Sequence, residues 1–113
     1  MASRVHIVLA ASAVVSATAN GSAFDTQRMH GPVAFVLAAT ADVAGTSLDV
    51  DIEAYDPLSG TWNVLGSFTQ IGGTTPSRER IIVTQVPEQQ IRGAWTIVGT
   101  SYTFSLSAAG LTA

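Results

Sequence analysis

The sequence predicts an all-β protein, an antiparallel β-sandwich or small barrel of seven to eight short strands with an extended N-terminal arm or strand. Three observations predict this class. Apolar and polar residues alternate with a period of two in several segments. Turn-forming residues recur between these segments at a spacing of about ten residues, and no segment shows a convincing amphipathic helical pattern.

The clearest predicted element is a β-hairpin over residues 48–68. In residues 48–55 apolar residues alternate with Asp49, Asp51 and Glu53, which places the carboxylates on one face of a strand. Residues 56–60 read Asp-Pro-Leu-Ser-Gly, a run of turn formers. Residues 61–68 alternate again, and we place Trp62 and Val64 on the inward face. The apolar face of this hairpin must be buried against a second apolar sheet.

The other segments follow the same pattern of short strands and turns. Strands are expected at residues 4–10, 33–40, 78–86, 91–98 and 102–108, with residues 10–20 as a second strand or an extended arm. Connections are expected as a turn at 20–22, a polar segment at 23–30 that Gly31-Pro32 breaks, a flexible segment at 69–76, a corner at 87–89, a tight hairpin at 99–101 and a short tail at 109–113.

The N-terminal segment has two possible readings. Residues 1–22 are predicted to form an N-terminal strand or arm, and residues 23–113 a single β-sandwich domain. Arg4, the apolar run 5–15 and the small residues that follow also have the order of a secretory signal. One arginine is a thin positive region and the apolar run contains a histidine, so we favour a structural segment. The run is too short and too rich in Ser and Thr for a transmembrane helix.

Composition indicates a surface that neighbouring subunits cover. Of 113 residues, 47% are apolar and only 12% charged, and the chain contains no lysine. Edge strands of free monomers normally carry lysine as a guard against pairing, so we expect obligate assembly. The net charge of −3 argues against general nucleic-acid binding. The chain has no cysteine, which excludes disulfides and cysteine–zinc sites.

No group of residues predicts catalysis, and we expect a protein that is not an enzyme and holds no metal or cofactor. Asp49, Asp51 and Glu53 would lie roughly 7 Å apart along a strand, which suits a solvated face better than a metal site. His6 and His30 have no second ligand at a metal-binding spacing. Trp62 and Trp95 are expected in the core.

Eight residues are the predicted partner contacts. The apolar N-terminal stretch would pair as a strand with a neighbour, Tyr55 lies at the mouth of the hairpin, and arginines form bidentate pairs across interfaces. The residues are Arg4, Val5, Ile7, Leu9, Tyr55, Arg78, Arg80 and Arg92.

Three stretches resemble a known group of proteins. They are residues 55–62 (Tyr-Asp-Pro-Leu-Ser-Gly-Thr-Trp), residues 65–69 (Leu-Gly-Ser-Phe-Thr) and residues 91–104, from Ile-Arg-Gly-Ala-Trp to Tyr-Thr-Phe. Together with their surroundings over residues 45–108 they resemble small β-sandwich virion proteins of actinobacterial tailed phages, of the capsid decoration or cement type. The matching residues form turns and core, and the resemblance brings no catalytic residues.

The resemblance implies a structural virion protein that binds the outer surface of the phage head and reinforces joints between major capsid subunits. The implied partner is the major capsid protein, the implied location is the head surface, and a homo-oligomer, with a trimer favoured, is expected. No membrane or nucleic-acid partner is expected. Two alternatives stay open: a tail-tube or minor tail protein, and a secreted carbohydrate-binding β-sandwich.

Overall fold

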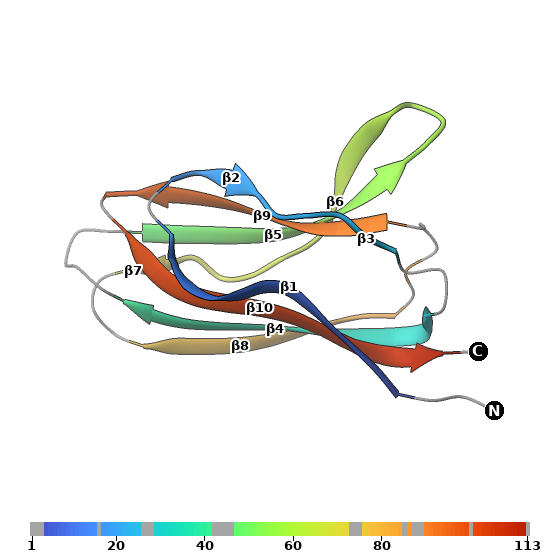
Figure 1. Ribbon diagram of the computed structural model, residues 1–113, viewed down its shortest axis with the longest axis horizontal. Helices are drawn as coiled ribbons and strands as arrows, with labels where there is room; N and C mark the ends of the chain where they lie inside the picture. The colour runs from blue at the N-terminus through green and yellow to red at the C-terminus, as the bar shows by residue number, and fades with distance from the viewer. Residues whose placement is uncertain are drawn as a thin grey trace.

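The structure, a computed structural model, describes residues 4–15, 17–25, 29–41, 47–72, 76–84, 86, 90–99 and 101–112. These residues form two antiparallel sheets packed face to face, so the predicted all-β sandwich is confirmed (Figure 1). The strands are β1 (Arg4–Val15), β2 (Ala19–Asn20), β3 (Phe24–Asp25), β4 (Met29–Ala41), β5 (Ser47–Asp56), β6 (Thr61–Ser67), β7 (Ile71–Gly72), β8 (Ser77–Val83), β9 (Gln90–Val98) and β10 (Tyr102–Thr112). None of the described residues belongs to a helix long and apolar enough to cross a bilayer.

The strand order is that of a jelly roll. One sheet has the order β1-β10-β4-β8, and the other has the order β2-β9-β5-β6, with β3 also paired to β9 and β7 to β5. If β2 with β3 and β6 with β7 are each counted as one interrupted strand, the described residues form eight strands, four in each sheet. Apart from β5 and β6, successive strands then lie in opposite sheets, the connectivity of double-sheet jelly rolls.

The core consists of the inward-facing residues of both sheets. Strands β5 and β10 each bury every second residue, as the period-two alternation predicts. The largest fully buried side chains are Tyr102, Phe35, Phe104, Leu37, Leu48, Ile52, Ile91, Leu106, Val33 and Val50. A side chain in place of Gly93 would meet Leu106 of the facing sheet, 2.6 Å from the added Cβ, so this position requires glycine for close sheet packing.

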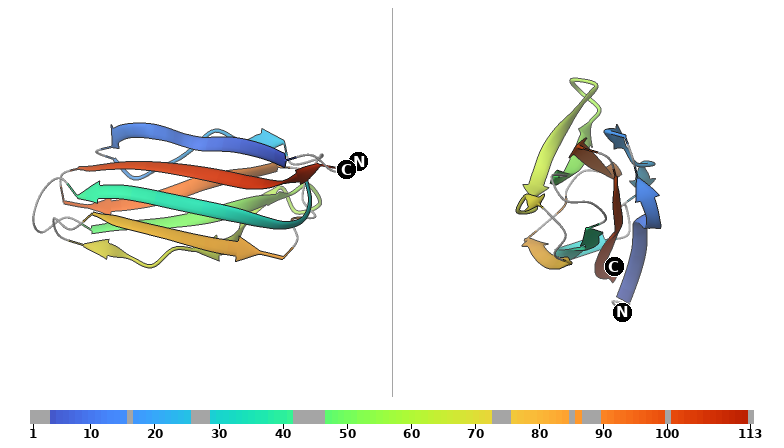
Figure 2. Two further views of the ribbon diagram at one scale, coloured as in Figure 1. Left: turned by 90° about the horizontal axis from the view of Figure 1, so that it is seen from below. Right: turned by 90° about the vertical axis from the view of Figure 1, so that its left-hand side faces the viewer.

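The N-terminal segment is an edge strand of the sandwich, not a free arm. β1 pairs with β10 from Arg4, opposite Leu111, to Val15, opposite Tyr102. Leu9 is only 3% exposed and belongs to the core. The pairing contains two register irregularities, between Val8 and Ala13. β1 runs alongside β10 at the edge of the sheet (Figure 2).

Several predicted connections are strands in the structure. β4 begins at Met29, and Gly31-Pro32 lies inside it where the β4–β10 register shifts. Gly31 has a φ of 69°, and bulges are where sheets accept such a glycine and a proline. Ile71, expected in a flexible segment, is buried and pairs with Leu48. The expected tail belongs to β10, which continues to Thr112.

The segment 99–101 is not a tight hairpin. β9 and β10, the strands on either side of it, lie in different sheets, so the chain crosses from one layer to the other there. The corner expected at 87–89 and the segment 26–28 lie outside the described residues.

The hairpin over residues 48–68 is confirmed as β5 and β6, but the first half of β6 does not have the predicted inward face. A register shift between Ile52 and Glu53 leaves Trp62 opposite Tyr55 and Val64 opposite Glu53. Both therefore lie on the outer face, and Val64 is 58% exposed. Trp95, in contrast, pairs with the buried Val50 and packs against Phe104 with ring centroids 5.3 Å apart, so it faces inward as predicted and lies partly buried against the core.

Candidate interaction surfaces

The outer face of the four-stranded sheet is almost without charge. Figure 2 shows its strands β1, β10, β4 and β8 side by side. On the two inner strands the outward residues are small or β-branched except Leu111, which is 47% exposed, and on the edge strands Val8 and Ile82 are each at least half exposed. We call this surface the small-residue face; it consists of His6, Val8, Val14, Ala34, Val36, Ala38, Arg78, Arg80, Ile82, Thr103, Ser105, Ser107, Ala109 and Leu111.

The two outer surfaces of the sandwich differ in their charged residues. The described residues of the small-residue face include two arginines at its β8 edge and no carboxylate, because Glu79 points inward. There Glu79 accepts hydrogen bonds from the backbone N–H (2.7 Å) and the hydroxyl (3.0 Å) of Thr69, which joins the two sheets. The outer face of the six-stranded sheet carries Asp49, Asp51 and Glu53 on β5.

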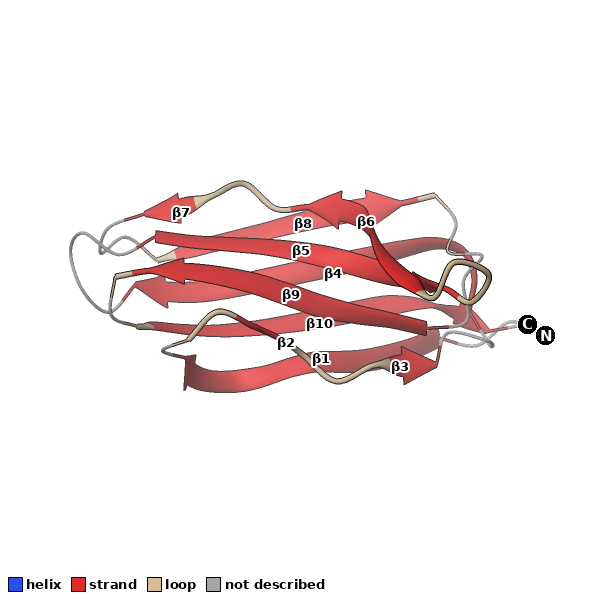
Figure 3. Cartoon of the chain, turned by 90° about the horizontal axis from the view of Figure 1, so that it is seen from above, coloured by secondary structure: helices blue, strands red, loops and turns tan. Residues whose placement is uncertain are grey.

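A hairpin projects from the six-stranded sheet, on the side away from the small-residue face (Figure 1, Figure 3). It consists of the end of β5, a turn, and the start of β6. Leu58 in the turn is 97% exposed. Gly60 has a φ of 69°, which glycine adopts without steric cost, and its backbone N–H donates to the carbonyl of Asp56 at 2.8 Å.

Asp56 holds the turn together. Its Oδ1 accepts a hydrogen bond from the backbone N–H of Leu58 at 3.0 Å, and its Oδ2 accepts one from the Ser59 hydroxyl at 2.8 Å. The Ser59 and Thr61 hydroxyl oxygens lie 2.6 Å apart. The Ser59 hydrogen bond, followed by the Leu58 amide, lowers the pKa of Asp56 below its ordinary value.

A cluster of aromatic and charged side chains supports the base of the hairpin. Tyr55 and Trp62 lie directly opposite each other, with ring centroids 5.2 Å apart and planes tilted by 53°. The Arg92 guanidinium lies 4.2 Å from the centroid of the Trp62 ring. Its Nε also donates to Glu53 Oε1 at 2.7 Å, with both side chains about four-fifths buried. These contacts lie outside the core and hold the hairpin upright.

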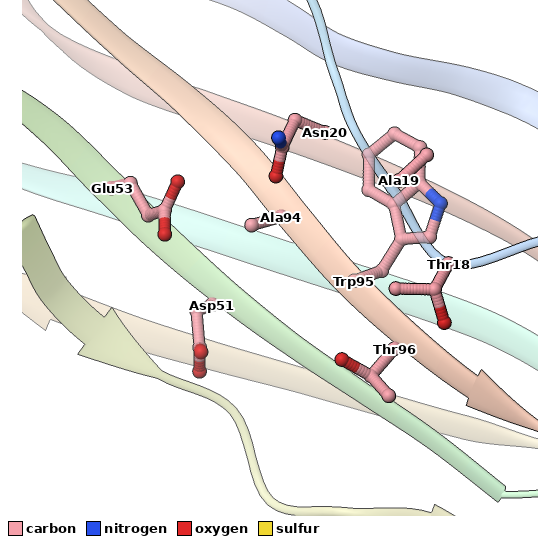
Figure 4. Close-up of a pocket in the computed structure, with 8 residues that line it drawn as sticks. All are labelled: Thr18, Ala19, Asn20, Asp51, Glu53, Ala94, Trp95 and Thr96. Atoms are coloured by element: carbon pink, nitrogen blue, oxygen red, sulfur yellow. The ribbon is translucent and has the colours of Figure 1, made fainter. Parts of the chain in front are cut away.

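A shallow pocket opens on the outer surface of the six-stranded sheet beside β2. It has a volume of about 360 Å³, and Figure 4 shows the side chains that line it. Asp51 and Glu53 come from β5, Trp95 from β9 and Asn20 from β2; the other lining residues are Thr18, Ala19, Ala94 and Thr96. The indole Nε1 of Trp95 is buried without a hydrogen-bond partner, and the Thr18 hydroxyl accepts the backbone N–H of Ile97 at 3.1 Å.

The acidic residues of β5 do not converge. Asp49 accepts a hydrogen bond from Gln70 at 2.9 Å, and Glu53 is paired with Arg92. Within the ranges that the structure describes, no three His, Asp or Glu side chains gather in a way that could hold a metal ion.

The structure distributes the eight predicted contact residues over three places. Tyr55 and Arg92 meet at the base of the projecting hairpin. Arg78 and Arg80 lie exposed on the small-residue face. Val5 and Ile7 pack against the core, Leu9 lies in it, and Arg4 begins β1. We therefore no longer propose Leu9 as a contact, and binding by the others stays a prediction.

Sequence reasoning missed two features of these surfaces, exposed Leu58 and outward Trp62. It allowed the carboxylates of β5 to meet Arg78, Arg80 or Arg92 on a neighbouring strand, and the structure selects the pair Glu53–Arg92. Tyr55 and Trp62 stand symmetrically about the turn, and this symmetry is the signal that they face each other. The pairing of Glu53 with Arg92 requires β5 and β9 to be neighbours, which local periodicity does not reveal.

Comparison with solved structures shows the same fold in virus-derived and other proteins. The SPBc2 prophage-derived protein YomS has a TM-score of 0.63 and 8% identity, with 99% of this chain and 96% of that chain covered. A chain of infectious bursal disease virus, Gx strain, has a TM-score of 0.60 and 14% identity, with 98% of this chain and 32% of that chain covered. The CBM36-1 domain of a multidomain xylanase from the hindgut metagenome of Trinervitermes trinervoides has a TM-score of 0.54 and 13% identity, with 96% and 97% covered.

Protein-family models and curated protein sequences give no match to this chain. At these identities the structural likeness establishes the fold alone. The chain shares its fold with a prophage-derived protein over nearly the full length of both. It corresponds to about a third of the chain from infectious bursal disease virus.

Proposed function

We propose that this chain is a non-catalytic structural virion protein that decorates the outer surface of a phage head and stabilises joints between major capsid subunits. The observation that carries the proposal is the small-residue face, a surface of mostly small and apolar residues without described carboxylates in a chain with few charges. The fold shared with a prophage-derived protein and with a viral chain supports it.

The size of the small-residue face suits a protein partner. Four strands spaced about 4.8 Å apart, each with about ten residues rising about 3.3 Å, cover roughly 600–700 Å². A standard protein interface buries about 800 Å² on each partner. Adding side chains at the edges brings the face to that size, so one capsid subunit can cover it.

The mechanism is mass action. A protein that binds only the assembled shell stabilises that shell by its binding free energy at every copy. Three copies around each local threefold position is the arrangement we propose, because capsid joints present that symmetry. Repetition over the shell then multiplies a modest interface.

The test is reconstitution with phage heads that lack this chain. Ser105→Asp places a carboxylate in the middle of the small-residue face, on β10, and should reduce binding to heads by at least about 10-fold, because a charge is buried without a partner. Thr96→Asp on β9 is the matched control on the opposite sheet, and it should bind as the original chain does. Sedimentation measures binding, and thermal melting confirms that both variants fold.

Equal binding of the two variants would refute docking through this face. Binding to purified tails and not to heads would favour the alternative of a tail-tube or minor tail protein. A chain that binds neither structure would refute the virion proposal.

A second candidate function is carbohydrate binding, which the pocket beside β2 favours. Two carboxylates, an asparagine and two threonines line it next to Trp95, and such polar groups recognise sugar hydroxyls. The aromatic rings at the hairpin base are not free to stack on a sugar, because Arg92 lies over the Trp62 ring and Tyr55 packs beside it. Titration with soluble xylan, followed by tryptophan fluorescence, tests this candidate; an Asp51→Ala variant should abolish any response.

A further inference from the structure

The turn of the projecting hairpin presents one large apolar side chain to solvent. Leu58 is 97% exposed, while its neighbours in the turn are Pro57, Ser59 and Gly60. Single exposed leucines are common on protein surfaces and by themselves indicate nothing. What distinguishes Leu58 is the support that the rest of the hairpin gives it.

The turn is ordered by its own polar groups. The Asp56 carboxylate accepts two hydrogen bonds, and the Asp56 carbonyl accepts the Gly60 N–H at 2.8 Å. Pro57 restricts φ at the position before Leu58. The turn therefore has little conformational freedom to lose when Leu58 is buried by a partner, and this preorganisation favours binding.

The hairpin base is equally well supported. Tyr55 packs against Trp62, and the Arg92 guanidinium lies over the Trp62 ring. Glu53 forms an ion pair with Arg92. Two aromatic rings and an ion pair are used here outside the core, where they stabilise the position of the hairpin and contribute nothing to packing between the sheets. This arrangement holds Leu58 away from the sandwich (Figure 1).

We propose that Leu58 is an anchor that inserts into an apolar socket with a basic rim on a second subunit of the shell. The charge of the socket follows from β5, which carries Asp49, Asp51, Glu53 and Asp56 and leads directly to the turn. Arg92 offsets Glu53, while Asp56 in the turn and Asp51 farther down the same strand leave the surface below the anchor acidic, so a basic rim complements it. The inference rests on the proposed virion function. A molecule with this anchor would link two subunits of the shell.

The bridge follows from the position of the two surfaces. The small-residue face lies on one side of the sandwich and the hairpin rises from the other (Figure 1). A molecule that binds one subunit by its face and another by its hairpin links them, and the second contact gains from the high effective concentration that the first provides.

A lipid surface does not fit the hairpin. Insertion into a bilayer uses several apolar or aromatic side chains with basic residues beside them. Here one leucine stands beside carboxylates, which anionic headgroups repel.

The first experiment measures binding of full-length variants to heads that lack this chain. Leu58→Ser should weaken binding by about 10-fold or more, which is the value of burying one leucine side chain. Val98→Ser removes a valine that is 59% exposed elsewhere on the six-stranded sheet and should leave binding unchanged. Equal affinity of both variants and the original chain would overturn the anchor.

The second experiment identifies what lies beside the tip. Photoreactive benzoylphenylalanine is placed at position 58, and in separate full-length chains at positions 8 and 98, and decorated heads are irradiated. Crosslinks from position 58 to the major capsid protein support the anchor. Crosslinks from position 8 without any from position 58 leave the proposed function in place and overturn the anchor, as do crosslinks from position 58 to a second copy of this chain. Failure of the unmodified chain to bind heads overturns both.

Discussion

The sandwich body and the projecting hairpin are stabilised by different interactions. The body buries alternate residues of two sheets, and its core contains ten fully buried large side chains. The hairpin beyond Tyr55 buries no such side chain, and it is held by hydrogen bonds of Asp56 and by contacts among Tyr55, Trp62 and Arg92. The comparison teaches that the hairpin can be loosened while the body stays folded. Three predictions test this separation, starting with the largest effect.

In the body, substitutions at two neighbouring residues of one strand should differ most in their effect on the free energy of unfolding. Phe104 is 1% exposed and packs edge-on against Trp95, so Phe104→Ala should lower the free energy of unfolding by about 3–5 kcal/mol. Ser105 points outward, and Ser105→Ala should change the free energy of unfolding by less than about 0.5 kcal/mol. Urea unfolding followed by tryptophan fluorescence measures both. Similar losses in the two variants would mean that β10 does not have the buried face described here.

At the hairpin base, Arg92→Ala should have an intermediate effect on the free energy of unfolding. It removes the guanidinium from the Trp62 ring and leaves Glu53 unpaired, which should cost about 1 kcal/mol because these side chains are partly solvated. Amide hydrogen exchange should rise in residues 55–62 and remain unchanged in β10. Arg78→Ala, which removes an exposed arginine of β8, is the control and should change neither quantity. Faster exchange throughout the molecule would contradict an independent hairpin.

At the tip, acid should loosen the turn without unfolding the body. The pKa of Asp56 is lower in the folded chain than in the unfolded one, so the carboxylate's contribution is fully present above the unfolded value and is lost as pH falls through the folded value. Amide exchange of Leu58 and Gly60, measured by NMR between pH 5 and pH 2 (about the range in which aspartates titrate), should rise relative to other turns. Asp56→Asn should show no such pH dependence, and an unchanged exchange rate in the original chain would refute the role of Asp56.

The hairpin shows which structural features the alternation of apolar and polar residues can predict. Asp49, Asp51 and Glu53 lie on the outer face of β5 as the alternation predicts. The predicted inward phase of β6 was wrong for Trp62 and Val64 because a register shift changes the phase within the strand. Gly66 lies opposite the buried Ile52, whereas Val64 lies opposite the outward Glu53. Local alternation contains no information about that shift, because it depends on which residues of β5 pair with which residues of β6.

The candidate surfaces were predictable only in part. Tyr55, Arg78, Arg80 and Arg92 were selected from residue type, and the structure places them on the small-residue face or at the hairpin base. Leu9 was selected from the apolar character of its segment, and that character reflects its place in the core. An apolar edge strand and an apolar docking arm have the same sequence pattern, and only the presence of β10 beside β1 separates them.

The sequence by itself determined that this chain forms β-strands with one buried face, that residues 56–60 form a turn, and that its surface carries little charge, because each of these depends on neighbouring residues in the chain. Tertiary structure alone decided the jelly-roll order, the outward position of Trp62 and the pairing of Glu53 with Arg92. These depend on contacts between residues far apart in the chain, where the choice is made by the combined packing of two sheets and not by any one segment.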